Sequence, residues 1–161
     1  MTQGSQLGDK STIHAARKHH PIVAEFFERG PGPLTRAGQL AIELKGSLLA
    51  VDPEAGTALS AWEPGEMFLQ GAGVIQGGIV TAMLDYAMAL VCFIRVAPGK
   101  TFGTVSMTTN FIKPAMPGRY LAKARIDRAG ARMMFVSSEL YRDGSDGLVA
   151  TACTVMAISD V

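Results

Sequence analysis

The feature that most constrains the fold is an apolar run over residues 79–94, in which Thr81 and Asp85 are the only clearly polar residues. The run is shorter than the roughly 20 residues that a helix needs to cross a bilayer, and a carboxylate lies near its middle. A helix that is apolar on every side is typical of the centre of a folded domain. The sequence therefore predicts a long buried helix that ends near Val96, before Pro98-Gly99.

The segments around this helix have the pattern of antiparallel strands. Residues 120–128 alternate small or apolar side chains with outward ones such as Lys123 and Arg125, which is the period of a half-buried strand. Gly- and Asp-rich turns separate several other extended stretches. Strands are expected over residues 40–51, 57–62, 105–112, 120–128, 132–141 and 148–158.

The N-terminal part is predicted to be a loose tail followed by a helix over residues 12–29, which Pro21 bends or divides. We assign residues 1–35 to this tail and helix and residues 36–161 to the main part of a single domain. The expected fold is α+β: an antiparallel sheet of about six strands wrapped around a long central helix, with an extra N-terminal helix. Because such a sheet leaves a free edge, self-association is expected.

Composition excludes several classes of protein. Of the 161 residues, 48% are hydrophobic and 18% are charged, which indicates a packed globular chain. A formal net charge of +1 argues against a protein built to hold nucleic acid. Cys92 and Cys153 lie in apolar runs and are interpreted as small buried hydrophobes, with a disulfide as the alternative. No metal-ligand spacing occurs, the first 20 residues lack the apolar core of a signal peptide, and a cytoplasmic location without membrane attachment is expected.

Asp85 is the residue that calls for a chemical explanation. A carboxylate among apolar neighbours is costly unless it is paired or hydrogen-bonded. No basic residue lies at positions 81, 82, 88 or 89, one helical turn away. Two interpretations stand: Asp85 faces a polar cavity or a subunit junction and acts chemically, or it bonds to the backbone of a neighbouring loop.

Gly77 and Gly78 open the same helix. Bare backbone N–H groups at the positive end of a helix can bind a carbonyl oxygen that becomes negative during acyl transfer. Gly77 and Asp85 are eight residues apart, or about 12 Å of helical rise. One carbonyl is therefore hard to reach from both residues of one chain, and a second subunit could supply the carboxylate.

A turn with two arginines, Arg128-Ala-Gly130-Ala-Arg132, and a second turn flanked by Lys113 and Arg119 are candidates for phosphate binding. Arginine forks and accessible N–H groups suit phosphate oxygens. A solvated hairpin tip is the alternative interpretation.

The segment Gln76-Gly-Gly-Ile-Val-Thr-Ala-Met-Leu-Asp85 resembles the HGG–x(6)–D/E motif of the hotdog-fold thioesterases, particularly the PaaI-like group. The resemblance covers roughly residues 40–158, including Val105-Ser-Met-Thr-Thr-Asn-Phe-Ile-Lys-Pro114. The family's His before the two glycines is Gln76 here, a departure that bears on catalytic detail and substrate class. A Gln amide can both donate and accept hydrogen bonds, so it could keep the loop in place.

The resemblance implies an acyl-CoA thioesterase that needs no separate cofactor and no metal. Asp85 matches the catalytic carboxylate, as nucleophile or as general base. Gly77 matches the glycine whose N–H polarises the thioester carbonyl, and Gln70 and Thr104 match groups that orient the carbonyl or the water. The implied site spans two subunits of a homodimer, which can pair into a homotetramer. The residues expected to contact the rest of the acyl-CoA are Gln76, Gly78, Lys113, Arg128, Gly130 and Arg132.

Two other functions remain open from the sequence. Hydratases and dehydratases of acyl thioesters share the fold but use a histidine with the helix acid, and no histidine follows His20. A non-catalytic acyl-CoA-binding protein would tolerate Gln76, although binding alone needs no carboxylate beside a thioester.

Overall fold

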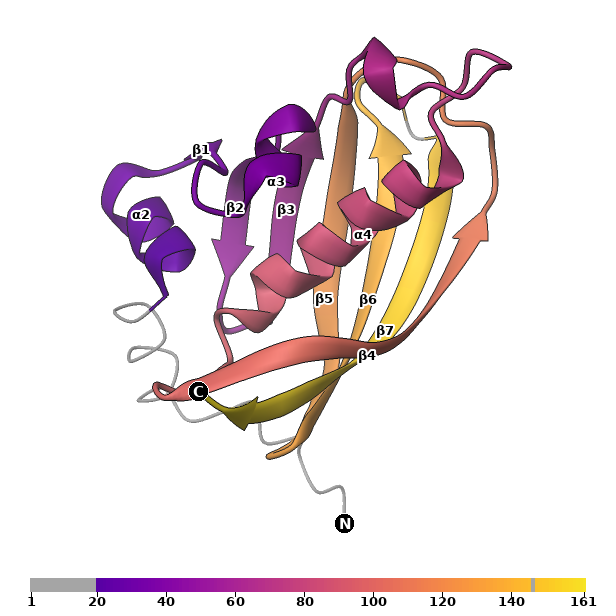
Figure 1. Ribbon diagram of the computed structural model, residues 1–161. Helices are drawn as coiled ribbons and strands as arrows, with labels where there is room; N and C mark the ends of the chain where they lie inside the picture. Colours follow the sequence, from indigo (N-terminus) through magenta and orange to yellow (C-terminus); the bar gives the residue numbers. More distant parts are fainter. Residues whose placement is uncertain (1–19, 146) are drawn as a thin grey trace.

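The computed structural model describes residues 20–161 except residue 146. The first elements are α2 (Pro21–Arg29), β1 (Gly32–Pro33), α3 (Gln39–Glu43), β2 (Ser47–Asp52), β3 (Thr57–Trp62) and a 3-10 turn, η1 (Glu66–Phe68). The long helix α4 (Gly77–Cys92) follows, and then β4 (Lys100–Phe111), β5 (Tyr120–Ala129), β6 (Met133–Arg142) and β7 (Leu148–Asp160). Helix α4 lies across one face of a sheet that curls around it (Figure 1).

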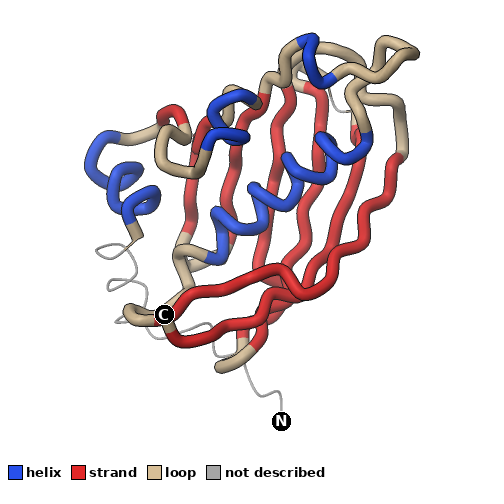
Figure 2. The backbone as a smooth tube through the Cα atoms, viewed as in Figure 1, coloured by secondary structure: helices blue, strands red, loops and turns tan. Residues whose placement is uncertain are grey.

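The strands form a seven-stranded sheet in the order β1-β2-β3-β5-β6-β7-β4, with each neighbouring pair antiparallel. The two-residue β1 adds to the six strands that the sequence predicts. β4 pairs only with β7 among the described strands and so forms one edge of the sheet. Figure 2 shows how far β4 and β7 bend around the helix.

The core lies between α4 and the sheet. Met83, Leu84 and Met88 of α4 are fully buried, as is Trp62 of β3. Val23 of α2 belongs to the same apolar cluster. The predicted alternation in β5 is confirmed, because its small side chains are buried while its charged side chains are exposed.

The predicted strand over residues 40–51 is wrong in its first part, because residues 39–43 form helix α3. Ala41 and Leu44 are both fully buried, and a spacing of three residues is that of one helical face. Gly46 then separates the helix from β2. A Cβ there would lie 2.4 Å from Trp62 Cζ3, so only glycine lets the chain pass so close to this buried ring.

Other boundaries differ by a few residues. Helix α4 ends at Cys92, four residues before the predicted end, because turns over residues 93–99 replace its last part. β4 begins at Lys100, five residues before the predicted start. Pro21 is the first residue of α2, where its missing N–H costs no helical bond, and the predicted segment before it lies outside the described residues. No helix of the described part is long and apolar enough to span a bilayer.

Candidate active site

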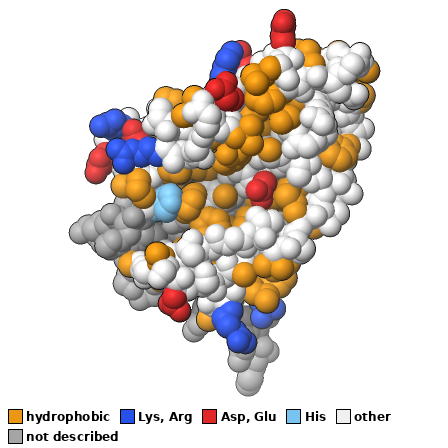
Figure 3. Space-filling view, in the orientation of Figure 1, with side chains coloured by type: hydrophobic (Ala, Val, Ile, Leu, Met, Phe, Trp, Pro, Cys, Tyr) orange, Lys and Arg blue, Asp and Glu red, His pale blue; other side chains and the backbone are white. Residues whose placement is uncertain are grey.

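Asp85 lies on α4, half-buried, on the side of the helix that the sheet leaves uncovered. Its Oδ1 accepts a hydrogen bond of 3.0 Å from the hydroxyl of Thr104 on β4. Within the described residues the carboxylate has no ion-pair partner and no backbone donor. Figure 3 shows this face of the molecule, with an acidic group surrounded by hydrophobic side chains in the region of α4.

Thr104 is brought to Asp85 by the bend of β4. It stands opposite Met156 of β7, and the register slips by one residue just after it, between Thr104 and Ser106. Such a bulge increases the local twist and redirects side chains. The Thr104 hydroxyl also lies 3.4 Å from the sulfur of Met156.

The N-terminus of α4 presents two backbone donors. Gln76 caps the helix through its carbonyl, which accepts bonds from the N–H groups of Ile79 and Val80. The N–H groups of Gly77 and Gly78 have no acceptor among the described residues. They therefore lie free at the positive end of the helix.

A tight loop next to these donors carries Gln70. The Gln70 N–H donates to the carbonyl of Val74 at 2.8 Å, and the Gln76 N–H donates to the carbonyl of Phe68 at 3.0 Å. These backbone bonds hold the loop. The side chain of Gln76 makes no hydrogen bond to the described residues, so the support expected from its amide is not seen in this chain.

The basic residues expected at the nucleotide end of a substrate lie at opposite ends of the sheet in one chain. Arg128 lies near the end of β5, and Gly130 and Arg132 lie in the exposed turn that follows. The register places Met133, the first residue of β6, level with Gly103 through β7. Lys113, also exposed, follows the other end of β4. One chain therefore cannot bring both groups to the same phosphate.

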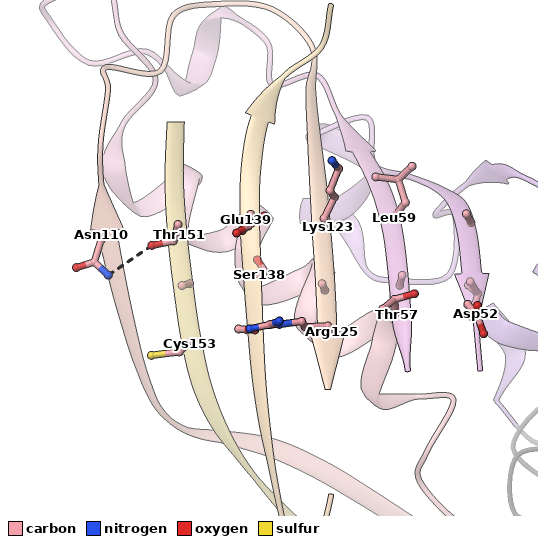
Figure 4. Close-up of a pocket in the computed structure, with 16 residues that line it drawn as sticks. Asp52, Thr57, Leu59, Asn110, Lys123, Arg125, Ser138, Glu139, Thr151 and Cys153 are labelled. Atoms are coloured by element: carbon pink, nitrogen blue, oxygen red, sulfur yellow. Dashed lines mark hydrogen bonds between the residues drawn. The ribbon is translucent and has the colours of Figure 1, made fainter. Parts of the chain in front are cut away.

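A cavity of about 660 Å³ lies on the face of the sheet opposite α4 (Figure 4). Neither Asp85 nor Gly77 lines it. Its polar side chains mostly bond to one another or to near neighbours, as Arg125 does with Ser137. No group of His, Cys, Asp and Glu side chains in the described part is arranged to hold a metal ion.

The electrostatics near Asp85 involve one other titratable side chain. Burial, and secondarily the negative charge of Asp85, raise the pKa of the Cys92 thiol to about 12. Cys92 therefore stays a neutral thiol at ordinary pH, as the interpretation of it as a buried hydrophobe requires. Cys153 differs from the expectation, because it is exposed on the outer face of the sheet. Both thiols are free.

Two residues near these groups were not singled out by the sequence. Phe111 at the end of β4 lies against Gly77, and a Cβ on Gly77 would be 3.3 Å from Phe111 Cζ. Met156 contacts Thr104 from β7. Both contacts depend on the register of distant strands, and nothing in the local sequence indicates them.

Comparisons with known proteins identify the family. The model of the thioesterase superfamily matches residues 72–149. A phenylacetic acid degradation-related protein from Ralstonia eutropha JMP134 is 31% identical, the match covers 83% of this chain and 97% of that one, and the TM-score is 0.73. No protein with a curated description matches the sequence.

Two further solved structures share the fold at lower identity. The PaaI protein of the Escherichia coli phenylacetic acid degradation operon is 18% identical over 91% of this chain and 94% of its own, with a TM-score of 0.70. A thioesterase from Haemophilus influenzae is 15% identical over 77% and 85%, with a TM-score of 0.70. The expected hotdog architecture is confirmed. With the Ralstonia relative covered almost completely, the chain belongs to the thioesterase superfamily.

Proposed function

We propose that the protein is an acyl-CoA thioesterase that hydrolyses its substrate to a free acid and CoA, with Asp85 as the catalytic carboxylate. The observation that carries the proposal is the situation of Asp85, half-buried on an apolar helix and held by one hydroxyl. A carboxylate with uncommitted lone pairs can take a proton from water or attack a carbonyl carbon. Membership of the superfamily supports an acyl thioester as the substrate.

In this reaction the N–H of Gly77 binds the thioester oxygen as it gains negative charge. Gln70 and Thr104 orient the carbonyl and the attacking water. When Asp85 acts as general base, it removes a proton from the water while the water oxygen bonds to the carbonyl carbon. The carbon–sulfur bond then breaks, and the CoA thiolate takes the proton that Asp85 received.

When Asp85 acts instead as nucleophile, its oxygen bonds to the carbonyl carbon, CoA leaves as the thiolate, and water opens the resulting anhydride. The two routes differ in where the oxygen of water goes. A single turnover in H₂¹⁸O labels the Asp85 carboxylate on the nucleophilic route if water attacks its carbonyl, and labels only the product acid on the general-base route.

The active site is shared between two copies of the chain. Within one chain, Gly77 and Asp85 are separated by about 12 Å of helical rise. Gly77 lies beside Phe111 at the end of β4, whereas Asp85 bonds to Thr104 near its beginning. If two β4 edges pair antiparallel about a two-fold axis, the end of one strand meets the beginning of the other. Gly77 of one protomer then faces Asp85 of its partner.

The β4 edge has the surface that such pairing needs. Val105 is 61% exposed and Phe111 57% exposed, on a twelve-residue strand with one side unpaired among the described strands. Exposed apolar edges of this length promote association. The same pairing brings Lys113 of one protomer toward the Arg128–Arg132 turn of the other, so both could contact the CoA phosphates. Mass measurement in solution distinguishes the homodimer from the homotetramer.

The proposed function is tested by thiol release from short, medium, long and aromatic acyl-CoAs, with wild-type protein and Asp85→Asn. We expect the wild type to release CoA and the variant to lose roughly 10²- to 10⁴-fold in kcat, the scale of a lost general base. An unchanged melting temperature would show that the variant is folded.

Unchanged turnover in Asp85→Asn would remove Asp85 from the mechanism. Two other results would replace the function itself. Formation of enoyl-CoA or hydroxyacyl-CoA without thiol release would indicate a hydratase or dehydratase, and tight CoA binding without hydrolysis of any substrate would indicate a binding protein.

A further inference from the structure

The Thr104 hydroxyl has one proton and two acceptors within reach. Asp85 Oδ1 lies at 3.0 Å and the sulfur of Met156 at 3.4 Å. An ionised carboxylate is the stronger acceptor, so in the resting state the proton points to Asp85. The thioether is then a second acceptor that the resting state does not use.

We propose that Met156 is a positioning residue whose sulfur accepts the Thr104 hydroxyl proton when Asp85 loses its negative charge. This inference rests on the proposed function of Asp85. As Asp85 takes a proton from water, it becomes a donor and needs an acceptor. When that proton lies on Oδ1, the Thr104 oxygen accepts it only if the Thr104 proton turns away, and the Met156 sulfur is the protein acceptor on that side.

The burial of Met156 makes its weak acceptor useful. The side chain is 1% exposed, so water does not compete for the sulfur. Thr104 is itself exposed, so solvent can also accept its hydroxyl proton, and the Met156 sulfur competes as an acceptor that is already fixed beside it. A thioether is polarisable but accepts weakly, so it leaves the Thr104 bond to the ionised carboxylate in place.

The register of the sheet fixes this geometry. Thr104 is directly opposite Met156 across β4 and β7, and Met134 of β6 is directly opposite Met156 on its other side. Met134 is equally buried, at 1% exposure. In the described residues its sulfur has no contact with a hydroxyl, so it supplies a matched control for removing one buried sulfur.

Few titratable groups near Asp85 could obscure a pH measurement. On α4 itself, Cys92 stays protonated because its pKa is raised to about 12 by burial and by Asp85. On β4 and β7, Lys100 pairs with Asp160 at the exposed start of β4. No charged side chain of the described residues contacts the Asp85 carboxylate. The pH dependence of kcat/KM can therefore be compared between variants without interference from another charged group at this site.

The test compares Met156→Leu with Met134→Leu, each of which replaces a methionine by a side chain of similar volume. In Met156→Leu, the protonated form of Asp85 loses its stabilisation. We therefore expect the acid limb of kcat/KM against pH to move to lower pH by about half a unit and kcat to fall roughly threefold, the scale of one neutral hydrogen bond. Met134→Leu should change neither, and the two variants should have similar melting temperatures.

A double mutant separates positioning from packing. In a Thr104→Val background there is no hydroxyl to turn, so adding Met156→Leu should leave the acid limb where Thr104→Val alone puts it. If Met156→Leu does not fold, replacing all methionines by norleucine changes sulfur to methylene at equal length. Norleucine replacement in the wild-type sequence should then move the acid limb of kcat/KM to lower pH as Met156→Leu does. The same replacement in Thr104→Val should not move it.

Overlapping pH profiles for Met156→Leu and Met134→Leu would overturn the inference, as would an equal shift in the Thr104→Val background. If Asp85→Asn is inactive while these profiles overlap, only the role of Met156 fails. If Asp85→Asn remains active, the proposed function fails as well.

Discussion

The two faces of the sheet differ in how far their polar groups are hydrogen-bonded within the chain. On the outer face, Arg125 bonds to Ser137 and Asp127, and Asn110 approaches Thr151, so these groups are partnered inside the chain. On the face covered by α4, Asp85 has one hydroxyl as its partner and the N–H of Gly77 has none within the described residues. The outer face has a cavity of about 660 Å³, yet the inner face has the groups with unused hydrogen-bonding capacity.

This difference means that the cavity and the groups with unused hydrogen-bonding capacity lie on opposite faces of the sheet. Partnered charges on an exposed strand surface contribute little and are poorly placed to react. A half-buried carboxylate with a single hydroxyl partner and a helix N-terminus with free N–H groups are costly to keep unless they bind something. We therefore propose that the reaction takes place on the α4 face. The predictions below test this assignment by changing residues on each face of the sheet.

After the loss of the Asp85 carboxylate itself, the largest expected effect comes from removing the Gly77 N–H. Gly77 is the first residue of α4, where proline is tolerated, and Gln76 before it is already extended at φ −59°, ψ 139°. Gly77→Pro should lower kcat roughly 10²- to 10³-fold, as expected for one lost oxyanion donor, in a thiol-release assay. Gly77→Ala keeps the N–H and places a similar Cβ against the movable ring of Phe111, so it should lose less than about tenfold.

A similar loss in both Gly77 variants would attribute the effect to crowding by Phe111 and remove the oxyanion role.

The smallest expected effect comes from the outer face. Arg125 has a side chain that is 70% exposed and pairs with Asp127. Arg125→Ala should change kcat/KM less than about twofold and the free energy of unfolding by less than about 1 kcal/mol, because exposed ion pairs contribute little. Thiol release and thermal unfolding measure the two quantities. A tenfold loss of activity at unchanged oligomeric mass would place part of the reaction in the outer cavity.

Much of the fold could be predicted from the sequence because its signals are local. The apolar run around Asp85, the alternation over residues 120–128 and the turn residues between strands each report on their own segment. The helix at the start of residues 40–51 was missed because the whole stretch is long enough for a strand. Its only helical signal is a pair of buried residues three positions apart, which is too short a pattern to stand out. The two-residue β1 leaves no periodic signal at all.

The candidate site was predictable in its residues and less so in its arrangement. Asp85 and Gly77 could be found because a lone acid and a glycine pair are unusual on an apolar helix. The family resemblance singled out Thr104 as a group that holds the water, but its hydrogen bond to Asp85 and the contacts of Met156 and Phe111 were not predicted. These contacts join strands that are distant in sequence, and a slip of one residue at the β4 bulge would change which side chain meets Asp85.

The most direct test of a site shared between protomers is activity in mixed dimers of Asp85→Asn and Gly77→Pro subunits. Each variant alone should be nearly inactive. A mixed dimer has one site with both defects and one site with the intact Gly77 of one subunit and the intact Asp85 of the other, so a random equal mixture should recover about one quarter of wild-type activity. Recovery near that level supports the shared site, and no recovery in mixed dimers of confirmed mass would contradict it.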